Sequence, residues 1–127
     1  MEKNLIQYLF GRVKSFKNAF QGLVYALRTQ KNAQIHLVAT VIVLLLGYAL
    51  KISIIEFMII LLCVSFVWAA ELLNTAIESL VDLCSPDYHP FARISKDLAA
   101  AAVLISALAS AVIGFLIFTP RIINLGK

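Results

Sequence analysis

Four acidic or amide side chains interrupt the mostly hydrophobic stretch Ala69 to Leu83, AAELLNTAIESLVDL. Glu71, Asn74, Glu78 and Asp82 recur every three or four residues, which is the spacing that keeps side chains on one face of a helix. At about 100° per residue they fall within a strip about 80° wide, along about 16 Å of helix axis. A helix over this stretch therefore presents two Glu, one Asn and one Asp in a row.

Carboxylate and amide oxygens at this spacing suit a hard divalent cation. Mg²⁺ prefers oxygen ligands, keeps several waters and commonly binds substrate phosphates as well. Such an ion offsets negative charge during phosphoryl transfer, and a second carboxylate can position or deprotonate an attacking hydroxyl. Carboxylates near hydrocarbon are costly and often mark function. The alternative is that they only reach the membrane interface or join helices, and Asp82, nearest the following loop, fits that alternative best.

A Lys-Asp pair follows the row after a short loop. Lys96 and Asp97 stand near the start of the next hydrophobic stretch, where an ammonium group can meet phosphate oxygens. Taken alone, Lys96 would equally suit a membrane-surface anchor. The five glycines form neither a P-loop nor a Gly-rich kinase loop, so ATP would have to bind through helix side chains and metal. His36 and His89 stand singly and are expected to be structural.

The elements that must position these residues are membrane helices. Of the 127 residues, 61% are hydrophobic and 14% are charged, whereas soluble domains have about 45–50% apolar and about 25% charged residues. This composition and length exclude a separate soluble catalytic domain. Any chemistry therefore takes place in or beside the bilayer.

Three hydrophobic stretches are long enough to cross a bilayer. We predict spanning helices at residues 33–50, 54–83 and 95–119, with Ser95 capping the third and a loop at residues 84–90 before it. Residues 1–31 repeat apolar side chains at helical spacing, which predicts an amphipathic helix lying on the membrane surface; a helix packed on a soluble partner is the alternative. The sequence thus predicts one all-α integral-membrane domain over residues 1–127.

Basic residues indicate the orientation. Eight of the eleven Lys and Arg lie in the N-terminal segment and the second loop, and three lie elsewhere. Because basic loops face the cytoplasm, we expect the N-terminus and the acidic end of the second span on the cytoplasmic side, where ATP is. The net charge of +4 suits an anionic membrane surface better than nucleic acid.

Three segments together resemble the small bacterial integral-membrane diacylglycerol kinase family: ELLNTAIESLVDL at 71–83, ARISKDLAAAAVLI at 92–105 and RTQKNAQIHL at 28–37. The similarity covers nearly the whole chain, and the pattern E-x-x-N-[ST]-A-[IV]-E-x-x-x-D is highly specific. The RT-x-x-N-x-x-IH segment, and YHP before the third span, are more similar to the undecaprenol kinase branch than to the diacylglycerol-preferring branch.

The resemblance implies a homotrimer in the bacterial cytoplasmic (inner) membrane, with active sites between neighbouring chains. ATP would enter from the cytoplasm and a lipid alcohol from the bilayer. Position by position, the resemblance implies that Glu71 is the catalytic base, that Glu78 binds Mg²⁺ and nucleotide, and that Asn74 contacts the metal-bound phosphate. It likewise implies nucleotide-site roles for Lys96, on phosphate, and Asp97.

One position departs from the family pattern. Gln30 stands where the family commonly has Glu, a second metal-binding acid. Gln keeps an oxygen but loses the charge, which should weaken a second Mg²⁺ site, although Asn32 could partly compensate. Gln30, and Lys14 in a loosely matched segment, are carried over as nucleotide-binding candidates, and Asp82 matches a further acid of the site.

The leading hypothesis is ATP- and Mg²⁺-dependent phosphorylation of a membrane lipid alcohol, undecaprenol to undecaprenyl phosphate, with diacylglycerol to phosphatidic acid as the alternative. A small oligomeric ion-coupled transporter is a hypothesis of another class. Transport carboxylates usually sit near mid-bilayer, whereas this row begins after the apolar residues 57–70 and runs out into a loop. A purely structural subunit predicts that replacing Glu71 alters assembly rather than turnover.

Overall fold

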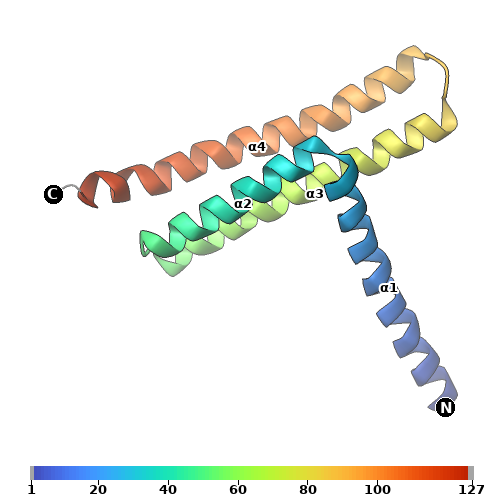
Figure 1. Cartoon of the computed structure of the whole chain (residues 1–127), viewed down its shortest axis with the longest axis horizontal. Coiled ribbons are helices and arrows are strands. Elements are labelled where there is room, and N and C mark those ends of the chain that lie inside the picture. The colour runs from blue at the N-terminus through green and yellow to red at the C-terminus, as the bar shows by residue number, and fades with distance from the viewer. Residues whose placement is uncertain (1, 126–127) are drawn as a thin grey trace.

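The structure is a computed structural model that describes residues 2–125, with the side chains of residues 7, 8 and 11–124. These residues form four α-helices and no strand: α1 (Glu2–Thr29), α2 (Lys31–Ala49), α3 (Ile54–Cys84) and α4 (Pro90–Leu125). The helices α2, α3 and α4 run side by side, with α3 packed against both others, while α1 projects away from them (Figure 1).

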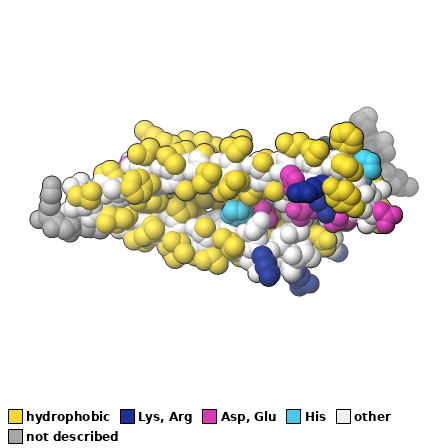
Figure 2. All heavy atoms as spheres, turned by 90° about the horizontal axis from the view of Figure 1, so that it is seen from above, with side chains coloured by type: hydrophobic (Ala, Val, Ile, Leu, Met, Phe, Trp, Pro, Cys, Tyr) yellow, Lys and Arg dark blue, Asp and Glu magenta, His cyan; other side chains and the backbone are white. Residues whose placement is uncertain are grey.

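Each of α2, α3 and α4 is long and apolar enough to cross a membrane. With 31 and 36 residues, α3 and α4 are about 46 and 54 Å long, whereas the hydrocarbon core is about 30 Å thick. Both helices therefore extend beyond it. Figure 2 shows a mostly hydrophobic face, with charged side chains gathered toward the end of the bundle that holds the α3–α4 loop.

The turn between α2 and α3 is fixed by its backbone. Lys51 has a left-handed conformation with φ 48°, and the next amide donates to the Gly47 carbonyl at 3.2 Å, as in a Schellman motif. Ser53 and Glu56 then form a capping box at the start of α3. Arg121 Nη2 donates to Glu56 Oε2 at 2.7 Å. The end of α4 is thereby tied to this turn.

A side-chain hydrogen bond sets how α2 lies along α3. Trp68 Nε1 donates to Thr40 Oγ1 at 3.1 Å, and the Thr40 hydroxyl donates to the His36 carbonyl at 2.7 Å. Since the two helices are antiparallel, this contact between residues 40 and 68 brings residues 36 and 71 opposite each other about one turn away.

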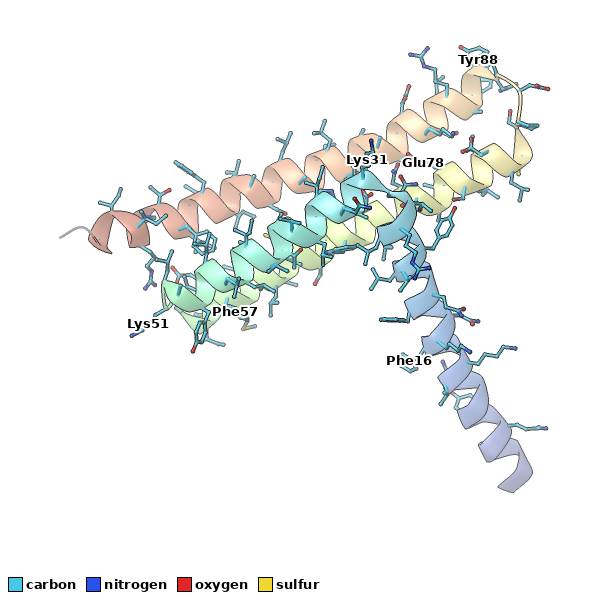
Figure 3. All side chains as sticks on the ribbon, viewed as in Figure 1. Phe16, Lys31, Lys51, Phe57, Glu78 and Tyr88 are labelled. Atoms are coloured by element: carbon cyan, nitrogen blue, oxygen red, sulfur yellow. The ribbon has the colours of Figure 1, made fainter. Side chains whose placement is uncertain are left out.

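Among the side chains of α1 that the structure describes, the buried and half-buried ones lie in its last turns. Ala26 is buried there, whereas Val13, Phe16 and Phe20 are exposed further out along the helix; Phe16 marks this projecting part in Figure 3. Of the predicted apolar stripe, Leu5 and Leu9 lie outside the described side chains. The placement of α1 on a membrane surface stays a prediction, which this exposed apolar face supports.

The helix that contains the third span begins five residues before Ser95, which therefore does not cap it. α4 begins at Pro90, because proline fits the first turn of a helix and His89 caps it: Phe91 N–H donates to His89 Nδ1 at 3.3 Å. Ser95 lies inside the helix, where its hydroxyl donates to the Phe91 carbonyl at 2.9 Å. The loop before α4 is correspondingly shorter than residues 84–90.

At its other end α4 continues beyond the predicted residue 119, through Pro120 to Leu125. A proline inside a helix removes one N–H donor and crowds the preceding turn. Here the very next residue, Arg121, donates to Glu56 and to the Lys51 carbonyl at 3.4 Å. These bonds hold the helix against the α2–α3 turn beyond the proline. The predicted spans at 33–50 and 54–83 differ from α2 and α3 by no more than two residues at either end.

Candidate active site

The four polar residues on α3 lie in different surroundings. Glu71 is fully buried and Asn74 is 5% exposed, whereas Glu78 is half-buried and Asp82 is exposed. Burial therefore falls along the helix, from the interior of the three-helix layer toward the α3–α4 loop. The two glutamates are seven residues apart, which is about 10 Å along the helix axis.

Glu71 is enclosed where α2 packs on α3. Its Oε2 lies 3.8 Å from His36 Nε2, and neither carboxylate oxygen has a hydrogen-bond partner among the described residues. The Thr75 hydroxyl donates only to the Glu71 backbone carbonyl, at 2.9 Å. Burying a carboxylate that has so few donors is costly, and for Glu71 this cost calls for a reason other than packing. Its oxygens are free to accept from another group.

Glu78 is held by two amides. Asn74 Nδ2 donates to Oε1 at 3.0 Å, and Gln30 Nε2 approaches Oε2 at 3.4 Å. Gln30 can reach α3 because its extended backbone, φ −106° and ψ 118°, separates α1 from α2. Figure 3 shows Glu78 at the place where this junction crosses α3. A carboxylate and two amide side chains thus meet at one point.

A second group of charges lies at the α3–α4 hairpin. The Lys96 ammonium pairs with the Asp82 carboxylate, and Asp97 Oδ2 lies 3.6 Å from Arg93 Nε. These residues line a polar hollow of about 310 Å³ beside the loop. Asp82 is one helical turn from Glu78, about 6 Å along the axis. A ligand with several phosphate groups could reach from one group of residues to the other.

Lys14 is not brought to either group. It is exposed on the projecting part of α1, sixteen residues before Gln30, or about 24 Å along the helix. Within a single chain, this candidate therefore lies away from the other predicted site residues.

The residues around Glu78 fit a magnesium ion. In the described part of the chain, no three His, Cys, Asp or Glu side chains gather closely enough to hold a metal. The carboxylate of Glu78 and the amide oxygens of Gln30 and Asn74 are hard donors, and Asn74 Oδ1 is buried without a partner. Mg²⁺ needs only one or two protein carboxylates, since waters and substrate phosphates complete its shell. A structural zinc site would need four ligands.

His36 was expected to be structural, yet it lies beside Glu71. Its isolation in the sequence hides this, because the partner comes from another helix. A signal does exist in the spacing: Gln30 and His36 are six residues apart on one side, and Glu78 and Glu71 are seven apart on the other. In antiparallel helices such matched spacings place both pairs in contact, so either contact would have predicted the other.

Comparisons with known proteins bear on the same residues. A family model described as prokaryotic diacylglycerol kinase matches residues 17–118. The chain is 46% identical over 109 residues to undecaprenol kinase of Bacillus subtilis (strain 168), covering 86% of this chain and 89% of that protein. It is 37% identical over 126 residues to diacylglycerol kinase of Synechocystis sp., covering 98% and 72%, and 31% identical over 75 residues to diacylglycerol kinase of Escherichia coli (strain K12), covering 59% and 62%.

The family match includes α2, α3 and most of α4, and with them every residue of the two groups described above. Together with the three candidate membrane spans, it makes the chain a multi-pass membrane protein and an enzyme that uses ATP. The transporter hypothesis receives no support from these matches. The chain belongs to the prokaryotic diacylglycerol kinase family of membrane lipid kinases.

Proposed function

We propose that the protein transfers the terminal phosphoryl group of ATP to the hydroxyl of undecaprenol, with diacylglycerol as the alternative acceptor. The observation that carries the proposal is the pair of carboxylates on one face of α3. Glu71 is enclosed with free acceptor positions, and two turns away Glu78 is oriented by two amides. A proton acceptor and a cation site are what phosphorylation of a hydroxyl requires. Undecaprenol comes first because the identity to an undecaprenol kinase is higher, 46% against 37%.

Glu78 would hold Mg²⁺, with Gln30 and Asn74 supplying amide oxygens or orienting the carboxylate. When bound, the ion offsets the negative charge of the phosphates during transfer. Lys96 exchanges its contact with Asp82 for a phosphate oxygen, which its flexible stem allows. Asp97 completes the nucleotide site at the hairpin, beside the same polar hollow.

Glu71 accepts the proton of the lipid hydroxyl. Both of its oxygens lack donors among the described residues, so the carboxylate offers free lone pairs to an incoming O–H group. Its position two turns further into the bundle than Glu78 suits an acceptor that arrives from the bilayer. ATP would arrive from the exposed end of α3, where Lys96 and Asp97 lie.

A homotrimer with sites between chains is part of the proposal. Lys14 lies about 24 Å along α1 from Gln30, so it can contribute to a nucleotide site only on a neighbouring chain. The exposed hydrophobic side chains of the single chain supply surfaces for such neighbours as well as for lipid. The distribution of basic residues supports a further part of the proposal, that the N-terminus and the nucleotide site lie on the cytoplasmic side of the bacterial inner membrane.

The test is phosphate transfer from labelled Mg-ATP by the purified full chain in lipid-containing micelles. Undecaprenol and diacylglycerol are offered side by side, with Glu71→Gln as the matched control. Label in one lipid, lost in the control, supports the kinase and names its acceptor. A folded wild-type protein that labels neither lipid would contradict the proposal.

Gln30→Glu tests the metal site separately. A second carboxylate at 3.4 Å from Glu78 repels it without a cation and shares a cation with it. We expect the variant to reach half-maximal rate at a lower Mg²⁺ concentration than wild type, measured in the same assay. An unchanged Mg²⁺ dependence would place the ion away from Gln30.

A further inference from the structure

We infer, on the basis of the proposed function, that His36 is a positioning residue for phosphate transfer. Its imidazole holds the Glu71 carboxylate in the orientation from which that carboxylate takes the proton of the lipid hydroxyl. The sequence motifs assign this residue no role in the reaction.

The contact between the two side chains is the first observation. His36 is the one basic side chain within 4.0 Å of the Glu71 oxygens in the described part of the chain, with Nε2 at 3.8 Å from Oε2. An approach of about 0.9 Å would turn this contact into a hydrogen bond to a charged acceptor. Hydrogen bonds of catalytic groups are often long in the free enzyme and tighten with substrate. Oε1 would stay free for the lipid hydroxyl.

The position of the ring is the second observation. The His36 side chain is 17% exposed and that of Glu71 only 1%. His36 also lines a mostly apolar hollow of about 230 Å³ between α2, α3 and α4, whereas Glu71 does not. The imidazole therefore stands between the hollow and the carboxylate. From there it can restrain Glu71 on one side.

The backbone of His36 is itself held in place. Its carbonyl accepts from the Thr40 hydroxyl at 2.7 Å, and the same Thr40 oxygen accepts from Trp68 Nε1 at 3.1 Å. These bonds fix one turn of α2 against α3 without touching Glu71. The backbone that carries the ring is thus in place before any substrate binds, so that only the side-chain torsions of His36 remain to be ordered during the reaction.

The proton bookkeeping requires only a neutral imidazole with its proton on Nε2. Once the contact has shortened to a hydrogen bond, that N–H donates to Glu71 Oε2 during the whole transfer. During transfer the O–H bond of the lipid breaks and its proton passes to Glu71 Oε1, while the hydroxyl oxygen bonds to the terminal phosphorus. The bond from that phosphorus to the bridging oxygen breaks, and ADP leaves. His36 neither gains nor loses a proton, so it acts through Glu71.

The experiment compares His36→Leu, His36→Gln and His36→Asn in the purified full chain, with kcat and both KM values measured in the micelle assay. Loss of one hydrogen bond to a charged group should lower kcat of His36→Leu by about ten- to hundredfold with little change in either KM. Gln can place an N–H near the position of Nε2 and should restore most of kcat, whereas the shorter Asn should not. Tyr48→Leu, a ring-to-leucine change at an exposed site on the same helix, should leave kcat unchanged.

Combination with Glu71→Gln separates this inference from the proposed function. If His36 acts through Glu71, His36→Leu should cause no further loss in the Glu71→Gln background. A raised KM for lipid at unchanged kcat would overturn the inference, and so would equal rates for the Gln and Asn variants. That Gln–Asn comparison decides the question even if His36→Leu does not fold. A wild-type chain without transfer activity, or a Glu71→Gln variant that turns over at the wild-type rate, would instead contradict the proposed function itself.

Discussion

Two glutamates on α3, fifteen residues apart, have opposite surroundings. Glu56 Oε2 accepts from Ser53 N–H at 2.6 Å and from Arg121 Nη2 at 2.7 Å, and its side chain is 27% exposed. Glu71 is 1% exposed and accepts no hydrogen bond from the described residues, with His36 at 3.8 Å. Two carboxylates on the same helix thus differ, since Glu56 accepts hydrogen bonds from its neighbours and Glu71 accepts none from the described residues.

The difference separates structure from reactivity. Glu56 caps its own helix and ties α4 to the α2–α3 turn, so its acceptor positions serve the fold. Buried polar groups are nearly always hydrogen-bonded, and a carboxylate that is not must have another reason to stay. Under the proposed function, the free carboxylate of Glu71 is the place for the hydroxyl of the lipid substrate. Partners, rather than residue type, distinguish the two roles.

The largest expected effect is that of Glu71→Gln. Removing a general base lowers the rate by about a hundred- to ten-thousandfold, while the amide keeps the shape of the side chain. Stability should be equal or higher, because an unpaired buried charge disappears. Turnover in the micelle assay and the midpoint of thermal unfolding measure the two effects. A destabilised variant with normal turnover would show that Glu71 is structural, which is what the hypothesis of a structural subunit predicts.

A smaller loss is expected from Lys96→Gln. If Lys96 contacts a phosphate oxygen, removing the charge should lower kcat/KM for ATP by about tenfold, which is the value of one hydrogen bond to a charged group. Nucleotide titrations of the initial rate measure this loss. The variant keeps a polar side chain at a half-buried position in the first turns of α4, where it loses only a partly exposed ion pair, so unfolding should change little. An unaltered kcat/KM would show that Lys96 makes no contact with phosphate and serves only to pair with Asp82.

The sequence predicts much of the helical framework that carries the two glutamates. Hydropathy locates α2 and α3 closely, and the spacing of the polar row alone predicts that it shares one face of α3. The sequence does not show which helix each member meets. That depends on the tight α2–α3 turn, where Lys51 takes a left-handed conformation, and on the Thr40–Trp68 bond, which sets the register.

The ends of α4 and the role of Glu56 were hidden for a related reason. Pro90 and Pro120 both suggest breaks, yet the first begins a helix and the second lies within one. The difference comes from partners distant in sequence, since Arg121 is held by a residue 65 positions away. Helix ends predicted from local sequence propensity take no account of contacts between residues so far apart. The position of His36 beside Glu71 was not predicted for the same reason, because the two residues lie on different helices.

Glu56→Gln is the matched control for Glu71→Gln, with the same chemical change on the same helix. It weakens the bond from Arg121 and the capping box, so we expect a midpoint of thermal unfolding lower by a few degrees. The two sites are about 22 Å apart along the axis and share no partner, so turnover below that midpoint should stay near wild type. A turnover loss comparable to that of Glu71→Gln would abolish the distinction between the two glutamates.

Asp82→Asn should have the smallest effect, and it tests whether a third carboxylate of α3 is structural or belongs to the proposed site. Asp82 has a partner, as Glu56 does, but its side chain is 66% exposed, and exposed ion pairs contribute little to stability. Unfolding should therefore be unchanged. If the reaction needed the intact ion pair between Asp82 and Lys96, Asp82→Asn and Lys96→Gln would lower kcat/KM for ATP equally. If Lys96 instead leaves Asp82 for a phosphate, Asp82→Asn removes only a competing acceptor, and kcat/KM should stay level or rise. The ratio of the two variants' kcat/KM values therefore decides whether the exposed end of α3 is a structural contact, like Glu56, or part of the reacting site, like Glu71.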